Sequence, residues 1–148
     1  MRAPASIIVL DATVLVSAVL GRSDAVIRDV QRVAALVTST RVIEEARRKI
    51  ELGLKAPELL PQLDTIAAAL AIVPVARLAP ALADAEVGLR DAVSSRNGST
   101  RDAHVLALAW MTGGDIWSAD GDFAGTGVAS WSTANLIRGL AIAGAELP

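Results

Sequence analysis

The sequence contains no cysteine and only one histidine, His104. The absence of cysteine excludes disulfides, thiol catalysis and cysteine-ligated zinc or iron–sulfur sites. It also fits a cytoplasmic protein, because reducing compartments disfavour disulfides. Aromatic residues make up only 3% of the chain although 53% of its residues are hydrophobic, so aliphatic side chains must build the core. This apolar surplus in a small domain predicts a buried surface between two copies of the chain, which means a homodimer.

The chain also lacks strong net charge and long apolar runs. A net charge of −2 gives none of the overall positive field of a general nucleic-acid binder. No apolar run approaches the roughly 20 residues needed to cross a bilayer, so no membrane association is expected. Asp11 interrupts the first apolar stretch, which argues against a signal peptide. A length of 148 residues favours a single domain over residues 1–148.

Strand-like and helix-like segments alternate along the chain. Residues 7–10 are an unbroken apolar run, typical of a strand buried on both faces of a parallel sheet. Further strands are expected at 36–39, 71–75, 116–118 and 128–131, and Pro74 assigns the third strand to a sheet edge. Helices are expected over residues 12–20, 25–35, 41–52, 57–70, 80–93, 102–111 and 134–140. The pattern predicts an α/β protein, a three-layer α/β/α sandwich with a mainly parallel sheet of four or five strands.

Several of these helices have a candidate capping residue just before them. Asp24, Thr40 and Thr133 are suited to accept hydrogen bonds from the first free N–H groups of a helix. Ser99 or Thr100 has the same position before the helix that contains Asp102.

Five acidic residues fall where this fold would bring them to one edge of the sheet. Asp11 ends the first strand, Glu45 lies early in the helix after the second strand, and Asp102 begins a later helix. Asp120 and Asp122 follow the fourth strand. The carboxyl ends of parallel strands share one edge, where ligands bind. Carboxylates gathered there repel one another, and a bound cation offsets the repulsion. Oxygen ligands favour Mg²⁺ or Mn²⁺ over zinc.

Each of these acids, taken singly, also fits a structural role. An aspartate at a helix start is favoured as a cap or by the helix dipole. Glu45 has arginines at helical spacing, which fits a surface ion-pair network, and Asp120-Gly121 is a common turn sequence. Only their combination favours a functional site.

Four motifs, in order, resemble those of PIN-domain nucleases. They are residues 8–18 (IVLDATVLVSA), 42–48 (VIEEARR), 101–109 (RDAHVLALA) and 116–123 (IWSADGDF). The resemblance spans nearly the whole chain and implies a PIN-like fold. It also implies a metal-dependent endoribonuclease, most often the toxin of a VapC-type toxin–antitoxin pair. The family usually has Thr or Ser, then Asn or Ser, after the first aspartate. Here Ala12 lacks a hydroxyl, whereas Thr13 keeps one that could bond a neighbouring acid.

The resemblance implies a role for each candidate residue. The catalytic metal ligands would be Asp11, Glu45, Asp102 and Asp120, with Asp122 assisting them or binding through water. They would hold one or two Mg²⁺ or Mn²⁺ ions, which activate water for attack on an RNA phosphodiester. The implied partners are an RNA substrate and a small antitoxin protein.

Four further residues are candidates for contacts with the substrate. They are Thr13, Arg41, Arg48 and Arg101, of which the arginines suit phosphate contacts. Taken singly, each arginine is better explained by solubility and ion pairing.

Two alternatives to a nuclease stay open. An aspartyl-phosphate hydrolase would use Asp11 as its nucleophile. That chemistry usually needs a second acid two residues later, where Thr13 stands, and a lysine for the phosphate. A PIN-like module that binds RNA or protein without cleavage is favoured by Ala12 and opposed by the complete set of acids.

The histidine and the tryptophans have structural interpretations. His104 is expected to be a helix residue near the rim of the cleft, because a metal-activated water needs no separate base. Trp110, Trp117 and Trp131 are expected to pack in the core rather than stack on bases.

Overall fold

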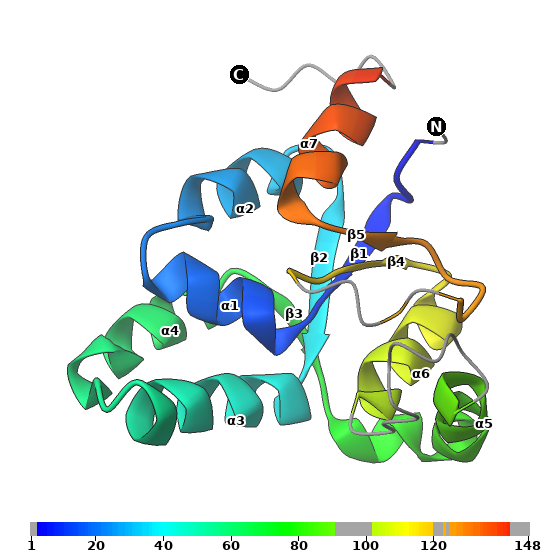
Figure 1. Cartoon of the computed structure of the whole chain (residues 1–148), viewed down its shortest axis with the longest axis horizontal. Coiled ribbons are helices and arrows are strands. Elements are labelled where there is room, and N and C mark those ends of the chain that lie inside the picture. Colours follow the sequence, from blue (N-terminus) through cyan, green and yellow to red (C-terminus); the bar gives the residue numbers. More distant parts are fainter. Residues whose placement is uncertain (1–2, 91–101, 120–122, 124, 143–148) are drawn as a thin grey trace.

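Five parallel strands form the sheet at the centre of the molecule (Figure 1). The structure is a computed structural model that describes residues 3–90, 102–119, 123 and 125–142. The strands lie in the order β3-β2-β1-β4-β5, and every neighbouring pair is parallel. Their bounds are β1 Ile7–Leu10, β2 Ala35–Ser39, β3 Ala71–Val73, β4 Asp115–Trp117 and β5 Ser130–Trp131.

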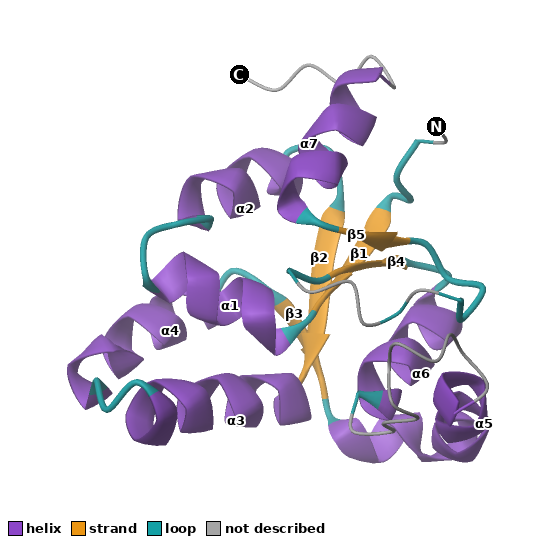
Figure 2. Ribbon diagram, in the orientation of Figure 1, coloured by secondary structure: helices purple, strands orange, loops and turns teal. Residues whose placement is uncertain are grey.

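Helices cover both faces of this sheet, which confirms the predicted three-layer α/β/α sandwich (Figure 2). One face is covered by α6, with α5 packed outside it. The other carries α1 and α2, with α3 and α4 packed beside α1, while α7 packs against β5. The helices are α1 Ala12–Val19, α2 Asp24–Gln31, α3 Thr40–Arg48, α4 Leu60–Ala67, α5 Ala79–Arg90, α6 Ala103–Thr112 and α7 Thr133–Ile142. None of them, among the described residues, has the length and apolarity that a bilayer crossing requires.

The central strand β1 is apolar because helices enclose it from both sides. Ile8, Val9 and Leu10 have no exposed surface, as the unbroken apolar run predicts. Helix α6 is buried around its first two turns, since the sheet covers one side and α5 the other. The core is therefore continuous from α1 through β1 to α6.

Short helical turns and one proline set the ends of several elements. Strand β3 is the edge strand, as predicted, but it ends at Val73, and Pro74 is the N-cap of a 3-10 turn over Val75–Leu78. After Arg48, α3 passes into a π-helical turn over Lys49–Gly53. Gly113 ends α6 in the left-handed conformation with φ 69°, which glycine adopts at little cost.

The caps differ from the prediction by one residue in two helices. Ser39 caps α3, because its hydroxyl accepts the backbone N–H of Val42 at 3.2 Å. Thr40, the predicted cap, instead accepts the N–H of Val75 at 3.0 Å. In α2 the N-cap position is Ser23, and Asp24 lies in the first turn.

At the starts of α6 and α7, residues other than the predicted ones occupy the capping positions. Asp102 occupies the N-cap position of α6, whereas Ser99 and Thr100, with the loop 94–100, lie outside the described residues. The hydroxyl of Ser132 accepts the N–H of Asn135 at 3.2 Å near the start of α7. Thr133, the predicted cap, accepts from the indole of Trp117.

The three tryptophans do not share one environment. Trp117 and Trp131 are buried in the sheet, as predicted. The prediction is wrong for Trp110, which is 40% exposed on α6. Its helix is apolar on every side, so periodicity could not identify which residues stay partly exposed, and the indole of Trp110 contacts α5 only in part, near Gly88.

Candidate metal centre

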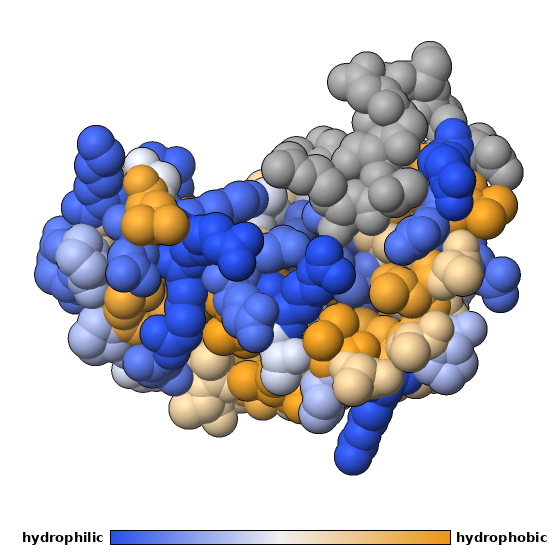
Figure 3. All heavy atoms as spheres, turned by 90° about the horizontal axis from the view of Figure 1, so that it is seen from below, coloured by the Kyte–Doolittle hydropathy of each residue, from blue (hydrophilic) through white to orange (hydrophobic). Residues whose placement is uncertain are grey.

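The candidate acids lie at the edge of the sheet where the strands end. The carboxyl ends of β1 and β2 point toward the bottom of Figure 1, and the chain passes there into α1 and α3. Helix α6 begins at the same edge because it runs back along the sheet to the start of β4. Figure 3 views the molecule from this side. Hydrophilic residues gather across the middle of the face, between apolar groups.

Asp11 is both a helix cap and a buried acid at this edge. Its side chain is only 4% exposed. One carboxylate oxygen, Oδ1, accepts the backbone N–H of Ala12 at 2.7 Å. The other, Oδ2, accepts the hydroxyl of Ser118 at 2.9 Å and that of Thr13 at 3.3 Å. The sequence allowed Asp11 to be either a helix cap or an acid of a functional site. The structure shows that one residue can be both.

Two hydroxyl groups connect Asp11 to the end of β4. Ser118 is fully buried beside Asp11, because Leu10 pairs with Trp117 in the sheet. Thr13 bonds Asp11 and also accepts the N–H of Ala119 at 3.1 Å. The hydrogen bond from Thr13 to a neighbouring acid was expected from the sequence, but the one from Ser118 was not. The signal for Ser118 was its position at the end of a predicted strand.

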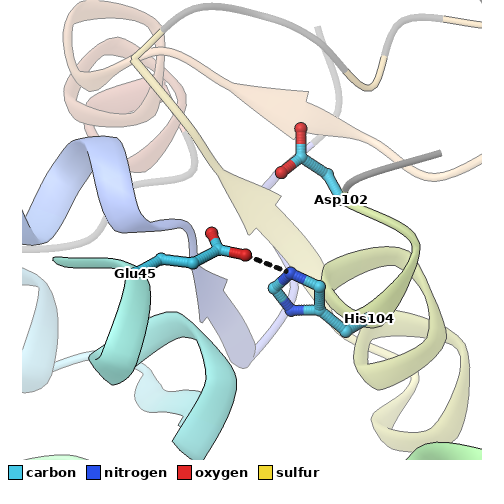
Figure 4. A group of neighbouring side chains, drawn as sticks. All are labelled: Glu45, Asp102 and His104. Atoms are coloured by element: carbon cyan, nitrogen blue, oxygen red, sulfur yellow. Dashed lines mark hydrogen bonds and ion pairs between the residues drawn. The ribbon is translucent and has the colours of Figure 1, made fainter. Parts of the chain in front are cut away.

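Three side chains from two helices form a group that could hold a metal ion. Glu45 of α3, Asp102 at the N-cap of α6 and His104 in the first turn of α6 each offer one ligand atom. These atoms all lie within 4.8 Å of one another. Figure 4 shows Glu45 and His104 pointing toward each other, with Asp102 nearby at the start of α6. Among the described residues, this group does not include Asp11.

Glu45 is held in a positively charged environment. His104 Nε2 lies 3.0 Å from Glu45 Oε1, and Arg41 Nε lies 3.9 Å from the same oxygen. Partial burial acts to raise the pKa of Glu45. The hydrogen bond and the electrostatic interaction with His104, together with the charges of Arg41 and Lys49, outweigh burial and lower that pKa below its ordinary value. Glu45 is therefore an ionised carboxylate at neutral pH, as a ligand for a cation must be.

His104 lies in the interior, not at the rim as the sequence suggested. Its side chain is 1% exposed, and its Nδ1 atom is buried with no hydrogen-bond partner among the described residues. Its sequence position, two residues after the candidate ligand Asp102, is the signal in the sequence for a place near the site.

The remaining candidate residues are only partly described. Arg41 and Arg48 are exposed on α3, three or four residues from Glu45 and thus on its side of the helix. Arg101, Asp120 and Asp122 lie outside the described residues. Ala119, the last described residue before Asp120, is held by Thr13 next to Asp11.

The donor atoms at this edge fit a divalent cation. Glu45 and Asp102 supply carboxylate oxygens, which suit Mg²⁺ and Mn²⁺. An imidazole nitrogen suits Mn²⁺ and other transition metals better than Mg²⁺. The sequence predicted ligands with oxygen atoms only. A set of donor atoms that includes the His104 imidazole would differ from that prediction.

Comparisons with known proteins agree with this fold. The profile of one protein family, described as PIN domain, matches residues 9–140. No curated protein matches the sequence at a significant level. One similar solved structure is VapBC2 from Rickettsia felis bound to a DNA fragment from their promoter. It has a TM-score of 0.64 and 14% identity, over 85% of this chain and 98% of that one. Another is PAE2754 from Pyrobaculum aerophilum, with a TM-score of 0.60 and 16% identity, over 90% of this chain and 95% of that one.

Proposed function

Because the chain belongs to the PIN-domain family, we propose that it is a metal-dependent endoribonuclease and the toxin of a toxin–antitoxin pair. The observation that carries this proposal is the meeting of Glu45 and Asp102 within 4.8 Å of one another. The two residues are far apart in the sequence. They meet at the edge of the sheet where β1 ends and the buried Asp11 follows it. Like charges brought together in this way favour a bound cation.

In the proposed mechanism, Asp11, Glu45, Asp102 and Asp120 hold one or two Mg²⁺ or Mn²⁺ ions, with Asp122 assisting. A bound ion would supply Lewis-acid activation of water and would neutralise charge on the phosphodiester. The chain's own residues provide the orientation. Ser118 and the N–H of Ala12 hold the Asp11 carboxylate in one position.

Substrate binding is proposed for the exposed face of α3 and the start of α6. Arg41 and Arg48 are exposed beside Glu45, where their guanidinium groups can contact RNA phosphates. Arg101 is a further candidate, and the first N–H groups of α6 favour a phosphate near Asp102. Thr13 is also proposed as a substrate contact, through its hydroxyl. That hydroxyl already donates to Asp11 and accepts the N–H of Ala119.

A small antitoxin and a second copy of the chain are the proposed protein partners. VapBC2 is a structure of similar fold named as a toxin–antitoxin complex, which supports the antitoxin. The homodimer is proposed on the apolar surplus of the chain, part of which is exposed as large apolar side chains that are each at least 37% exposed. They are Leu20, Val33, Leu52, Leu54, Ile72, Val87, Trp110, Met111 and Ile137.

The test is RNA cleavage by purified protein in Mg²⁺ or Mn²⁺, with and without EDTA. Asp11→Asn should reduce cleavage at least about 100-fold, because a neutral amide cannot replace an anionic ligand. Asp84→Asn is the matched control, since Asp84 is exposed on α5, and it should leave cleavage unchanged.

Three outcomes would contradict the proposal. Cleavage that survives EDTA would remove the metal from the mechanism. Tight RNA binding without cleavage in any divalent metal would favour a module that only binds. A labile covalent phosphate on Asp11 would favour the aspartyl-phosphate hydrolase.

A further inference from the structure

We propose that His104 is a positioning residue, which holds Glu45 by donating its Nε2–H and does not itself bind the metal. The inference rests on the proposed metal-dependent function, since Glu45 is one of the proposed ligands. It concerns the one histidine of the chain, which lies in the same group of three as Glu45 and Asp102.

The first argument is the direction of the hydrogen bond between His104 and Glu45. The two atoms that it joins, Nε2 and Oε1, lie 3.0 Å apart. An ionised carboxylate can only accept hydrogen bonds. Nε2 must therefore carry the proton, whether the imidazole is neutral or charged.

The second argument is the other ring nitrogen, Nδ1. Among the described residues it has no hydrogen-bond partner, and it is buried. A histidine that binds a metal through Nε2 carries its remaining proton on Nδ1 and normally donates it to a carboxylate, a carbonyl or a water. Here that proton would be buried without an acceptor, which is costly. With the proton kept on Nε2, no buried N–H is left without an acceptor, and the bond to Glu45 is retained.

The distances alone would also allow the opposite arrangement. Neighbouring ligands on an octahedral ion lie about 3 Å apart, close to the separation of Nε2 and Oε1. The environment of Nδ1 is what decides between the two arrangements. Within the described part of the chain, Nδ1 has no acceptor that would orient the ring as a ligand, whereas the bond to Glu45 needs nothing from Nδ1.

Glu45 needs such a restraint because its side chain has three rotatable bonds and is only partly buried. Its side chain is 27% exposed, and Arg41 contacts it from solvent at 3.9 Å. His104 is 1% exposed and fixed in α6. Fixing one carboxylate oxygen from a rigid neighbour presents the other oxygen to the cation. Loss of such a partner typically weakens metal affinity about 10- to 100-fold.

The experiment is a Mn²⁺ titration of the full chain followed by electron paramagnetic resonance. His104→Leu removes the donor and should weaken Mn²⁺ binding about 10- to 100-fold. His104→Gln can place an amide N–H near the position of Nε2 and should stay within about threefold of wild type. Arg41→Gln is the control for charge alone, and its effect should be about twofold or less because exposed pairs are weak.

Pulsed measurements on the wild-type Mn²⁺ complex provide a test that needs no variant. A directly bound imidazole gives a strong coupling to ¹⁴N, which we expect to be absent. In a Glu45→Gln background, His104→Leu should cause little further loss, because the group that it positions has been removed. Circular dichroism checks that each variant folds. If His104→Leu does not fold, the wild-type spectrum and His104→Gln decide the question.

The outcomes separate this inference from the proposed function. Wild-type protein that binds no Mn²⁺ would overturn the proposed metal-dependent function and this inference with it. Mn²⁺ binding with strong ¹⁴N coupling, or with unchanged affinity in His104→Leu, would overturn the role of His104 alone.

Discussion

The hydroxyl of Ser118 should contribute measurably to stability through its bond to Asp11. Ser118 is fully buried, and its hydroxyl lies 2.9 Å from the carboxylate of Asp11. A hydrogen bond to a charged group contributes about 1.5–3 kcal/mol. Asp11 keeps the N–H of Ala12 at 2.7 Å when Ser118 is lost, so the lower part of that range is expected for Ser118→Ala. For a chain of this length, about 1.5 kcal/mol corresponds to a fall in Tm of roughly 3–6 °C.

Urea unfolding of metal-free protein measures this effect, and Ser130→Ala is a matched control. The hydroxyl of Ser130 is also buried, but it has no hydrogen-bond partner among the described residues. Its removal should be neutral or stabilising, because an unpaired buried hydroxyl opposes folding. The midpoint should fall for Ser118→Ala without a change in slope. Equal effects of the two substitutions, or a loss below about 0.5 kcal/mol for Ser118→Ala, would refute the reasoning.

Three further predictions test the site and its support. Thr13→Val should lower RNA cleavage about tenfold, since it removes one of the two hydroxyl groups that connect Asp11 to the end of β4, and Thr13→Ser should restore most of it; single-turnover cleavage rates measure both. Gly114→Ala should cost about 1–3 kcal/mol in urea unfolding, because its Cβ would lie 2.8 Å from a backbone oxygen, whereas Gly53→Ala enters open space and should change stability little. Folding lowers the pKa of Glu45 below 4.5, so its ionisation stabilises the fold above that pH and the benefit disappears as pH falls through the folded-state pKa. The stability difference between metal-free wild type and Glu45→Gln should therefore shrink between about pH 7 and about pH 3; a constant difference would contradict this.

The fold could be predicted from the sequence where burial leaves a simple pattern. The strand at Ile7–Leu10 is buried on both faces and reads as an unbroken apolar run. The edge position of β3 was predicted because Pro74 cannot donate to a ladder, although Pro74 lies just after the strand and not within it. The one-residue difference between Ser39 and Thr40 could not, because both side chains are suited to capping. A contact with Val75, far along the chain, determines which of them caps α3.

The site could be predicted in part, because strand ends place acids at one edge. Asp11, Glu45 and Asp102 lie at that edge as predicted, although their roles as ligands stay predictions. The buried contacts of His104 and Ser118 could not be predicted, because they depend on how α3, α6 and β4 pack against one another. A sequence pattern locates residues along an element, but it does not report which side chain of another element lies opposite.

The order of the strands has a consequence for how the protein is made. β1 is made before the other strands of this sheet, yet one of its two neighbours is β4, the fourth of them in the sequence. Asp11 can meet Ser118 only after synthesis has passed the end of β4. The buried contact that holds the Asp11 carboxylate therefore cannot form while only the first three strands have been made.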